Sequence, residues 1–205
     1  VDRLCQAVAW AVANKQTFTR LVDMGIKESG LGDAVSRMGK RMKIRGVLRD
    51  ALRQKSVGII EELPAKGIVK YGKPAGIVAC IVPTTNPDLT PAGNAIYGIK
   101  ARNCVIFSPH PRSKKTSYET VRLMREALER TYNATPDPKW VVAVGDCARD
   151  GGLFAGSYAV TGGVSAVVPV DLHIAGCPPR PVELLKGLLA LVGVYSLMSY
   201  LTSRR

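Results

Sequence analysis

Apolar residues recur at helical spacing near the start of this chain of 205 residues. They run from Leu4 to Ile26, and their spacing predicts one helix over residues 3–26 that ends before Gly30 and Gly32. A basic stretch follows at residues 36–55. Its apolar positions lie four residues apart, so we expect an amphipathic helix with one buried face and one solvated, charged face.

From residue 67 the pattern changes to short β-rich runs that alternate with helical segments. Thr90 is the expected N-cap of the first of these helices, with Pro91 as its first residue. The expected strands cover residues 67–71, 76–82, 104–107, 140–144 and 166–170, and the expected helices cover 91–102, 114–131 and 181–201. Alternation at these lengths is typical of parallel strands with right-handed crossovers. We therefore predict an α/β fold made of three-layer, parallel-sheet (Rossmann-like) pieces, in two incomplete sheets.

The helix expected over residues 181–201 is almost entirely apolar. Its apolar part is shorter than the roughly 20 residues that a membrane span needs. A buried or interfacial helix is therefore the prediction.

Charge divides the chain unevenly. Residues 1–130 hold 23 Lys and Arg against 11 Asp and Glu, whereas residues 131–205 hold 6 against 5. Such asymmetry indicates two origins, and we predict two domains, residues 1–130 and residues 131–205. The positive charge also leaves open a basic interaction module. The stretch at residues 36–55 has no aromatic residue that could stack on a base, so nucleic acid is not the favoured partner.

Cysteines are widely spaced in this chain, and their number is odd. The five are Cys5, Cys80, Cys104, Cys147 and Cys177. No secretory signal is visible, so we expect reduced thiols in a cytoplasmic protein. Two of the cysteines, Cys80 and Cys104, lie within predicted buried strands. We expect both to be unreactive core residues, because a nucleophilic cysteine needs an accessible thiolate.

Residues 73–112 contain a predicted strand, a Pro/Asn loop, a helix and a second strand that ends in Ser-Pro-His-Pro. Loops at the carboxyl ends of adjacent parallel strands are the usual ligand-binding positions of such sheets. The expected helix N-terminus also offers N–H groups to a phosphate or carboxylate. The G-x-G-x-x-G fingerprint of dinucleotide sites is absent from this segment.

A first resemblance is carried by the segments KPAGIVACIVPTTNP and ARNCVIFSPHPRSKKTS. They resemble the CoA-acylating branch of the aldehyde dehydrogenase superfamily, over roughly residues 1–128. The resemblance implies NAD(P) binding, with one loop beside the nicotinamide and a second under the adenosine ribose. The residues implied for the first loop are Pro83, Thr84, Thr85 and Asn86, and those for the second are Ser108, Pro109, His110 and Pro111. A plain surface role for His110 stays open. That family's nucleophilic cysteine lies beyond the matching region, so we assign no catalytic residue.

A second pair of motifs places Cys147 in GDCARDGG and Cys177 in GCPPRP, each near the end of a predicted strand. Thiolates in loops flanked by Gly and Pro suit a metal ion or an iron–sulfur cluster. From about Glu129 to Lys186 the chain resembles the iron–sulfur small subunit of respiratory complex I and of the membrane-bound hydrogenase and formate hydrogenlyase group.

This second resemblance implies that Cys147 and Cys177 are two of four thiolate ligands of a [4Fe–4S] cluster, with Asp171 and Arg180 close by. It also implies electron transfer, partner subunits in a membrane-bound complex, and a peripheral position on the cytoplasmic face of the membrane. The family's other two ligands form an early pair that this sequence does not contain. A labile cluster, a cluster shared between chains, bound zinc and two free thiols all stay open, as does a homo-oligomer.

The chain is therefore predicted to join parts of two oxidoreductases near residues 128–134, with both catalytic sites incomplete. Whether it is an enzyme is left open. The alternatives are a catalytically inactive basic interaction protein and an artefactual gene fusion.

Overall fold

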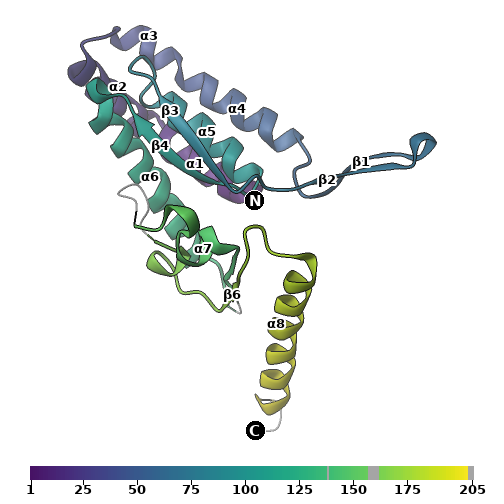
Figure 1. Ribbon diagram of the computed structural model, residues 1–205. Coiled ribbons are helices and arrows are strands. Elements are labelled where there is room, and N and C mark those ends of the chain that lie inside the picture. Colours follow the sequence, from purple (N-terminus) through teal and green to yellow (C-terminus); the bar gives the residue numbers. More distant parts are fainter. Residues whose placement is uncertain (138, 157–161, 203–205) are drawn as a thin grey trace. The chain divides into compact units, whose positions relative to one another are not determined.

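The computed structural model describes residues 1–137, 139–156 and 162–202. The chain divides into two compact units, Val1–Ala134 and Thr135–Arg205, and each is described here by itself (Figure 1).

The first unit is mainly helical, and its N-terminal segment departs from the prediction. Two helices replace the single helix expected over residues 3–26, because the chain breaks at Asn14. The Asn14 side chain accepts a hydrogen bond of 2.9 Å from the Thr17 N–H and so caps the second helix. The helices of this unit are α1 (Asp2–Ala13), α2 (Lys15–Ser29), α3 (Ala34–Gly39), α4 (Arg41–Arg53), α5 (Leu89–Lys100) and α6 (Lys114–Asn133).

Two further helix predictions need correction. The basic stretch forms α3 and α4, which meet at Lys40, instead of one helix. Most of its cationic side chains are exposed, as expected, but Arg37 is 2% exposed. The expected N-cap Thr90 lies inside α5, which begins at Leu89. Its N-cap is Asp88, whose carboxylate accepts a hydrogen bond of 2.8 Å from the Leu89 N–H.

Four strands form two separate sheets in this unit. An antiparallel hairpin joins β1 (Gly58–Leu63) to β2 (Ile68–Gly72) and extends away from the helices (Figure 1). Only its second strand was predicted. The other sheet pairs β3 (Ile77–Val82) with β4 (Cys104–Pro109) in parallel, as the strand–helix alternation indicated.

The core of the unit lies between the helices, where side chains of α1, α2, α4, α5 and α6 pack together. Phe18, Leu21, Ile44 and Ile96 are each fully buried in it. By contrast, the parallel sheet is covered on one side only within the described residues. Cys80 is buried at 4%, whereas Ile81 on the opposite face is 83% exposed. The sheet thus has only two strands and a cover on one side, consistent with the predicted incomplete sheets.

The two strand cysteines of this sheet have different surroundings. Cys80 is a core residue, as predicted, and its sulfur accepts a hydrogen bond of 2.7 Å from Asn94 of α5. Cys104 is exposed, which contradicts the prediction. The reason is that Cys104 begins β4, at one end of a sheet of only two strands.

Ion pairs run along α6. Arg122 pairs with Glu119 and with Glu126, and Arg125 pairs with Glu129 at 3.6 Å. Glu119 also binds Arg20 of α2 at 2.8 Å, and its side chain is 13% exposed. The hydrogen bond from Arg122 is the main reason that the pKa of Glu119 falls from 4.5 to about 2; burial opposes this and Arg20 adds to it.

Replacing Glu119 with glutamine removes its ion pairs with Arg20 and Arg122, so we expect the free energy of unfolding of this unit at pH 7 to fall by about 1–2 kcal/mol. The loss is smaller than the pKa shift alone implies, because Arg20 is half exposed and water screens its charge. A carboxylate whose pKa is depressed by folding stabilises the fold above its unfolded pKa, and this contribution disappears as the pH falls through the folded pKa. The difference between wild type and Glu119→Gln should therefore shrink between about pH 5 and pH 2. Urea unfolding at a series of pH values measures it, with Glu129→Gln as the control; a gap that does not change with pH would contradict the assignment.

The second unit contains two short parallel strands, β5 (Val142–Val144) and β6 (Leu172–Ile174). A five-residue helix, α7 (Asp146–Asp150), follows β5 directly. The strand predicted over residues 166–170 is wrong. Residues Val164–Ala166 form a 3-10 helix, and Pro169 has no N–H to donate to a sheet. The strand that pairs with β5 comes a few residues later.

The last element is α8 (Pro181–Thr202), which contacts β6 near its start. The helix prediction is confirmed, with its end one residue later. Large apolar side chains on it are exposed, namely Val182, Leu185, Leu188, Leu189 and Val192. Among the helices in the described part of the chain, none is long and apolar enough to cross a membrane.

Candidate functional site

The two loops predicted to hold NAD(P) lie side by side. In the parallel sheet Ile81 is opposite Ser108 and Val82 is opposite Pro109. The His110 N–H then donates a hydrogen bond of 3.0 Å to the Val82 carbonyl, which continues the pairing past the end of β4. Residues 83–86 and 108–111 therefore leave the same edge of the sheet, where parallel sheets bind ligands.

Lys40 holds the first loop in place from the junction of α3 and α4. Its ammonium group donates to the Thr85 carbonyl at 2.9 Å and to the Asn86 side-chain oxygen at 2.8 Å. Burial is the main cause that lowers the pKa of Lys40, and the nearby Arg37 adds to it. Sequence reasoning missed this contact, because Lys40 is one of many cations in the basic stretch and lies 45 residues before Thr85.

Thr84 and Asp88 decide how a dinucleotide could fit this loop. The Thr84 hydroxyl is buried and has no hydrogen-bond partner within the described residues, so it is available to a ligand group. The N-terminus of α5 is not available to a phosphate, because the Asp88 carboxylate already caps it and would repel a second anion. The loop residues thus fit a nicotinamide dinucleotide whose phosphates lie elsewhere.

The second loop is fixed by its own side chains. Nδ1 of His110 accepts a hydrogen bond of 3.2 Å from the Arg112 N–H, and Arg112 in turn donates to the Ser29 carbonyl at 2.7 Å. Glu28 caps the start of α6 through the N–H groups of Lys115 and Thr116, at 2.7 and 2.8 Å. Burial alone would raise the pKa of Glu28, but these hydrogen bonds outweigh burial and lower it. Ser108, Pro109, His110 and Pro111 are all exposed and open to a ligand.

The second predicted site lies after β5 and β6, and its two cysteines are neighbours. In the sheet Val144 is opposite Ile174. Beyond the sheet, Asp146 and Gly176 exchange two hydrogen bonds: the Asp146 N–H donates to the Gly176 carbonyl at 3.0 Å, and the Gly176 N–H donates to the Asp146 carboxylate at 2.9 Å. The next residue in each segment is a cysteine.

The Cys147 thiol is half-buried and the Cys177 thiol is exposed. Burial, followed by the adjacent Cys177 thiol, raises the pKa of Cys147. Gly152 lies close by; an added Cβ there would be 3.1 Å from the Cys147 sulfur. The two predicted ligands are thus together in one site.

The surroundings of this cysteine pair do not fit a complete [4Fe–4S] cluster. Such a cluster is normally held by four thiolates. Within the described ranges, no group of three or more His, Cys, Asp or Glu residues could hold a metal ion. The Asp171 carboxylate accepts a hydrogen bond of 2.7 Å from the Val141 N–H, so it braces the start of β5. Arg180 lines an open groove of about 740 Å³ next to α8.

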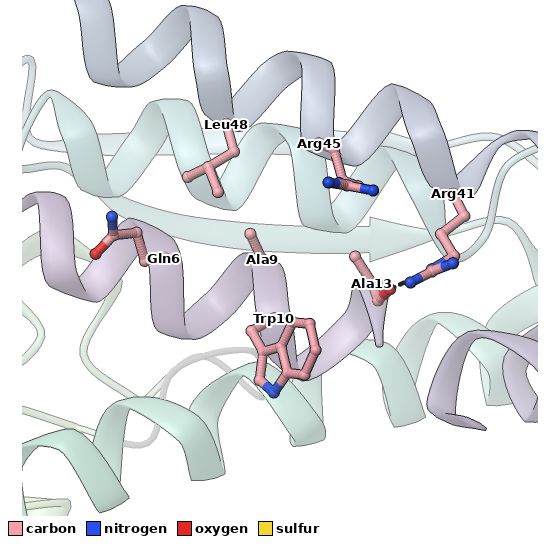
Figure 2. A pocket seen from close by; sticks show the side chains of 7 residues that line it. All are labelled: Gln6, Ala9, Trp10, Ala13, Arg41, Arg45 and Leu48. Atoms are coloured by element: carbon pink, nitrogen blue, oxygen red, sulfur yellow. Dashed lines mark hydrogen bonds between the residues drawn. The ribbon is translucent and has the colours of Figure 1, made fainter. Parts of the chain in front are cut away.

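A further pocket lies between α1 and α4 in the first unit and was not predicted (Figure 2). It has a volume of about 400 Å³ and combines the exposed Trp10 with Arg41 and Arg45. The Arg41 guanidinium donates a hydrogen bond of 2.5 Å to the Ala13 carbonyl, so it closes one end of the pocket.

Comparison with known proteins finds both expected families. Sulfoacetaldehyde dehydrogenase of Acholeplasma sp is 42% identical over 131 residues, which is 63% of this chain and 27% of that protein. An acetylating aldehyde dehydrogenase structure from Geobacillus thermoglucosidasius has a TM-score of 0.59 and 33% identity, over 66% of this chain and 29% of that one. The chain thus spans between a quarter and a third of these dehydrogenases.

The second family matches over more of its own length. An NADH-quinone oxidoreductase subunit of Heliobacterium modesticaldum is 36% identical over 130 residues, which is 62% of this chain and 71% of that protein. The sequence family described as NADH ubiquinone oxidoreductase, 20 Kd subunit, matches residues 98–191. This match begins within α5, closer to the N-terminus than the motifs near Cys147 indicated. The basic interaction protein is not favoured by these findings. The chain belongs to the family of this NADH-quinone oxidoreductase subunit, and it also contains a region homologous to acylating aldehyde dehydrogenases.

Proposed function

We propose that this protein is an oxidoreductase-derived chain whose first domain, residues 1–130, binds NAD(P) at the edge of the β3–β4 sheet. The observation that carries the proposal is the parallel register that brings residues 83–86 next to residues 108–111. The unpartnered Thr84 hydroxyl and the exposed second loop support it. A bound nicotinamide supplies hydride transfer, and the residues of this chain hold and orient it.

Aldehyde chemistry is not part of the proposal, because no described residue of this unit is placed to act as its nucleophile. Cys5 and Cys80 are buried, and burial is the main cause that raises the pKa of Cys5. Cys104 is exposed but lies at the start of β4, whereas the two loops follow the ends of β3 and β4.

Calorimetric titration with NAD⁺ and NADP⁺ tests this function. We expect saturable binding in the millimolar range or tighter. Replacing Lys40 with methionine should weaken binding about tenfold, because two charge-assisted hydrogen bonds that order residues 85 and 86 are lost. Lys43→Met is the matched control, since Lys43 is an exposed cation on α4 and should leave the affinity unchanged. Absence of saturable binding to the wild-type chain at millimolar cofactor would reject the proposal.

For the second domain, residues 131–205, we infer descent from an iron–sulfur electron-transfer subunit. Two neighbouring thiols that match two of the family's ligand positions support this origin. Because residues 131–205 contain only these two cysteines, and no third ligand lies beside them among the described residues, a full cluster would need thiolates from a partner chain. Anaerobic reconstitution followed by iron counting tests whether this pair takes part in such a shared cluster. About four iron atoms per cluster and visible absorbance would support the shared cluster, and iron-free protein would reject it.

The exposed apolar side chains of α8 support the inference that this domain docks on other subunits of a membrane-bound complex, at the cytoplasmic face of the membrane. Co-sedimentation with liposomes checks the membrane part of this inference, and protein that stays in the supernatant would contradict it.

A further inference from the structure

Cys147 and Cys177 occupy equivalent positions after two parallel strands. Residues of β5 and β6 pair with a constant offset of 30 positions, from Val142 opposite Leu172 to Val144 opposite Ile174. The same offset holds for the Asp146–Gly176 hydrogen bonds and for the two cysteines. Neither cysteine lies in a strand: Cys147 is the second residue of α7, and Cys177 follows β6. Their proximity rests on the hydrogen-bonded Asp146–Gly176 pair that immediately precedes them.

The backbone around the pair is held in place before any ligand is bound. The Gly145 N–H donates to the Ile174 carbonyl at 2.7 Å, one residue before the Asp146–Gly176 pair. Arg149 adds an ion pair of 3.3 Å to the Asp146 carboxylate. Three hydrogen bonds therefore align the two segments as far as the residues that precede the cysteines.

We propose that Cys147 and Cys177 form a redox-active dithiol that closes to an intramolecular disulfide by exchange with a small-molecule disulfide. In the first step one thiolate attacks the small disulfide, forms a mixed disulfide and releases one thiol. In the second step the other cysteine attacks the mixed disulfide, forms the Cys147–Cys177 bond and releases the second thiol. Two protein thiols are oxidised, one small disulfide is reduced to two thiols, and the two protons leave with them.

This inference concerns a different domain from the dinucleotide site and does not depend on it. It applies to the iron-free form of the pair, because thiols that bind a cluster cannot at the same time form a disulfide. The exposed Cys177 thiol is accessible to the small disulfide, and the half-buried Cys147 is next to it to complete the exchange. Two thiols alone can carry out this two-electron chemistry, whereas a [4Fe–4S] cluster normally needs four.

The test uses the full-length, iron-free chain, reduced and then incubated with oxidised glutathione. After acid quenching and alkylation, peptide mass spectrometry should find Cys147 linked to Cys177. In Cys147→Ser and Cys177→Ser the remaining cysteine has no partner, so it should accumulate bound glutathione at a level about tenfold above that in wild type, where the second thiol removes it. Cys104→Ser is the matched control and should leave the linkage intact.

A denatured sample keeps the experiment decisive if a serine variant folds poorly. In urea the alignment of the two segments is lost, so the Cys147–Cys177 link should be at least about tenfold rarer than in the folded chain. Equal link yields in folded and denatured wild type would overturn the proposal. So would glutathione that stays bound to both cysteines in the folded protein, or a link from either of them to Cys104.

Discussion

Replacing Phe18 with alanine is expected to lower the free energy of unfolding of the Val1–Ala134 unit by about 3–5 kcal/mol. Phe18 is fully buried in the core cluster, to which five helices contribute side chains, and it is among the largest of the fully buried side chains in the described part of the chain. Its removal loses the transfer free energy of the ring and leaves a cavity that the surrounding core can only partly fill.

The two tryptophans allow this effect to be measured unit by unit. Trp10 lies in the first unit and Trp140 in the second. Urea unfolding of Phe18→Ala in a Trp140→Phe background follows Trp10 and therefore the first unit alone. Tyr118→Ala is the control, because Tyr118 is 67% exposed and should cost less than about 0.5 kcal/mol. A cost below about 1 kcal/mol for Phe18→Ala would mean that the helices do not form one shared core.

Replacing Gly176 with alanine should destabilise the second unit by about 2–4 kcal/mol. Gly176 has a φ of +128°, which L-residues rarely adopt. A Cβ there would also lie 2.6 Å from the Pro179 Cα and 2.9 Å from its nitrogen. Both are backbone atoms, so the segment that carries Cys177 must move to make room.

Gly162→Ala separates the two causes. Gly162 also has a positive φ, +98°, but among the described residues nothing lies within 4 Å of an added Cβ. It should therefore show only the conformational cost of about 1–2 kcal/mol. Unfolding followed by Trp140 in a Trp10→Phe background gives both values. An equal loss in the free energy of unfolding for the two variants would show that the contact with Pro179 contributes nothing. A larger loss for Gly176→Ala should come with a lower yield of the Cys147–Cys177 link, because the segment that carries Cys177 has moved.

Local signals predicted much of this fold, and the failures have local causes. The start of α6 at Lys114 and of α8 at Pro181 follow from apolar spacing and helix start residues. The break at Asn14 was missed because apolar spacing continues through it, so only one capping side chain marks the boundary. The misplaced strand at residues 166–170 shows the reverse error, in which valines favour a strand that Pro169 cannot join.

The sites were predictable in position but not in detail. Parallel strands bring the ends of β3 and β4 together by a general rule, so the two loops could be placed from the sequence. The Lys40 contact with Thr85 and the Asp146–Gly176 pair join residues 45 and 30 positions apart. No local pattern encodes such contacts, because they depend on how separate elements pack.

The ion pairs of α6 are relevant to how a chain that joins regions of two protein families could arise. They join residues three or four positions apart, such as Arg122 with Glu126 and Arg125 with Glu129, so the helix is reinforced from within. The helix ends at Asn133, one residue before the boundary between the two units. A genetic crossover whose breakpoint falls in these codons would therefore yield a helix that still forms. Selection against the joined gene would then act on lost activity and not on misfolding at the junction of the two regions.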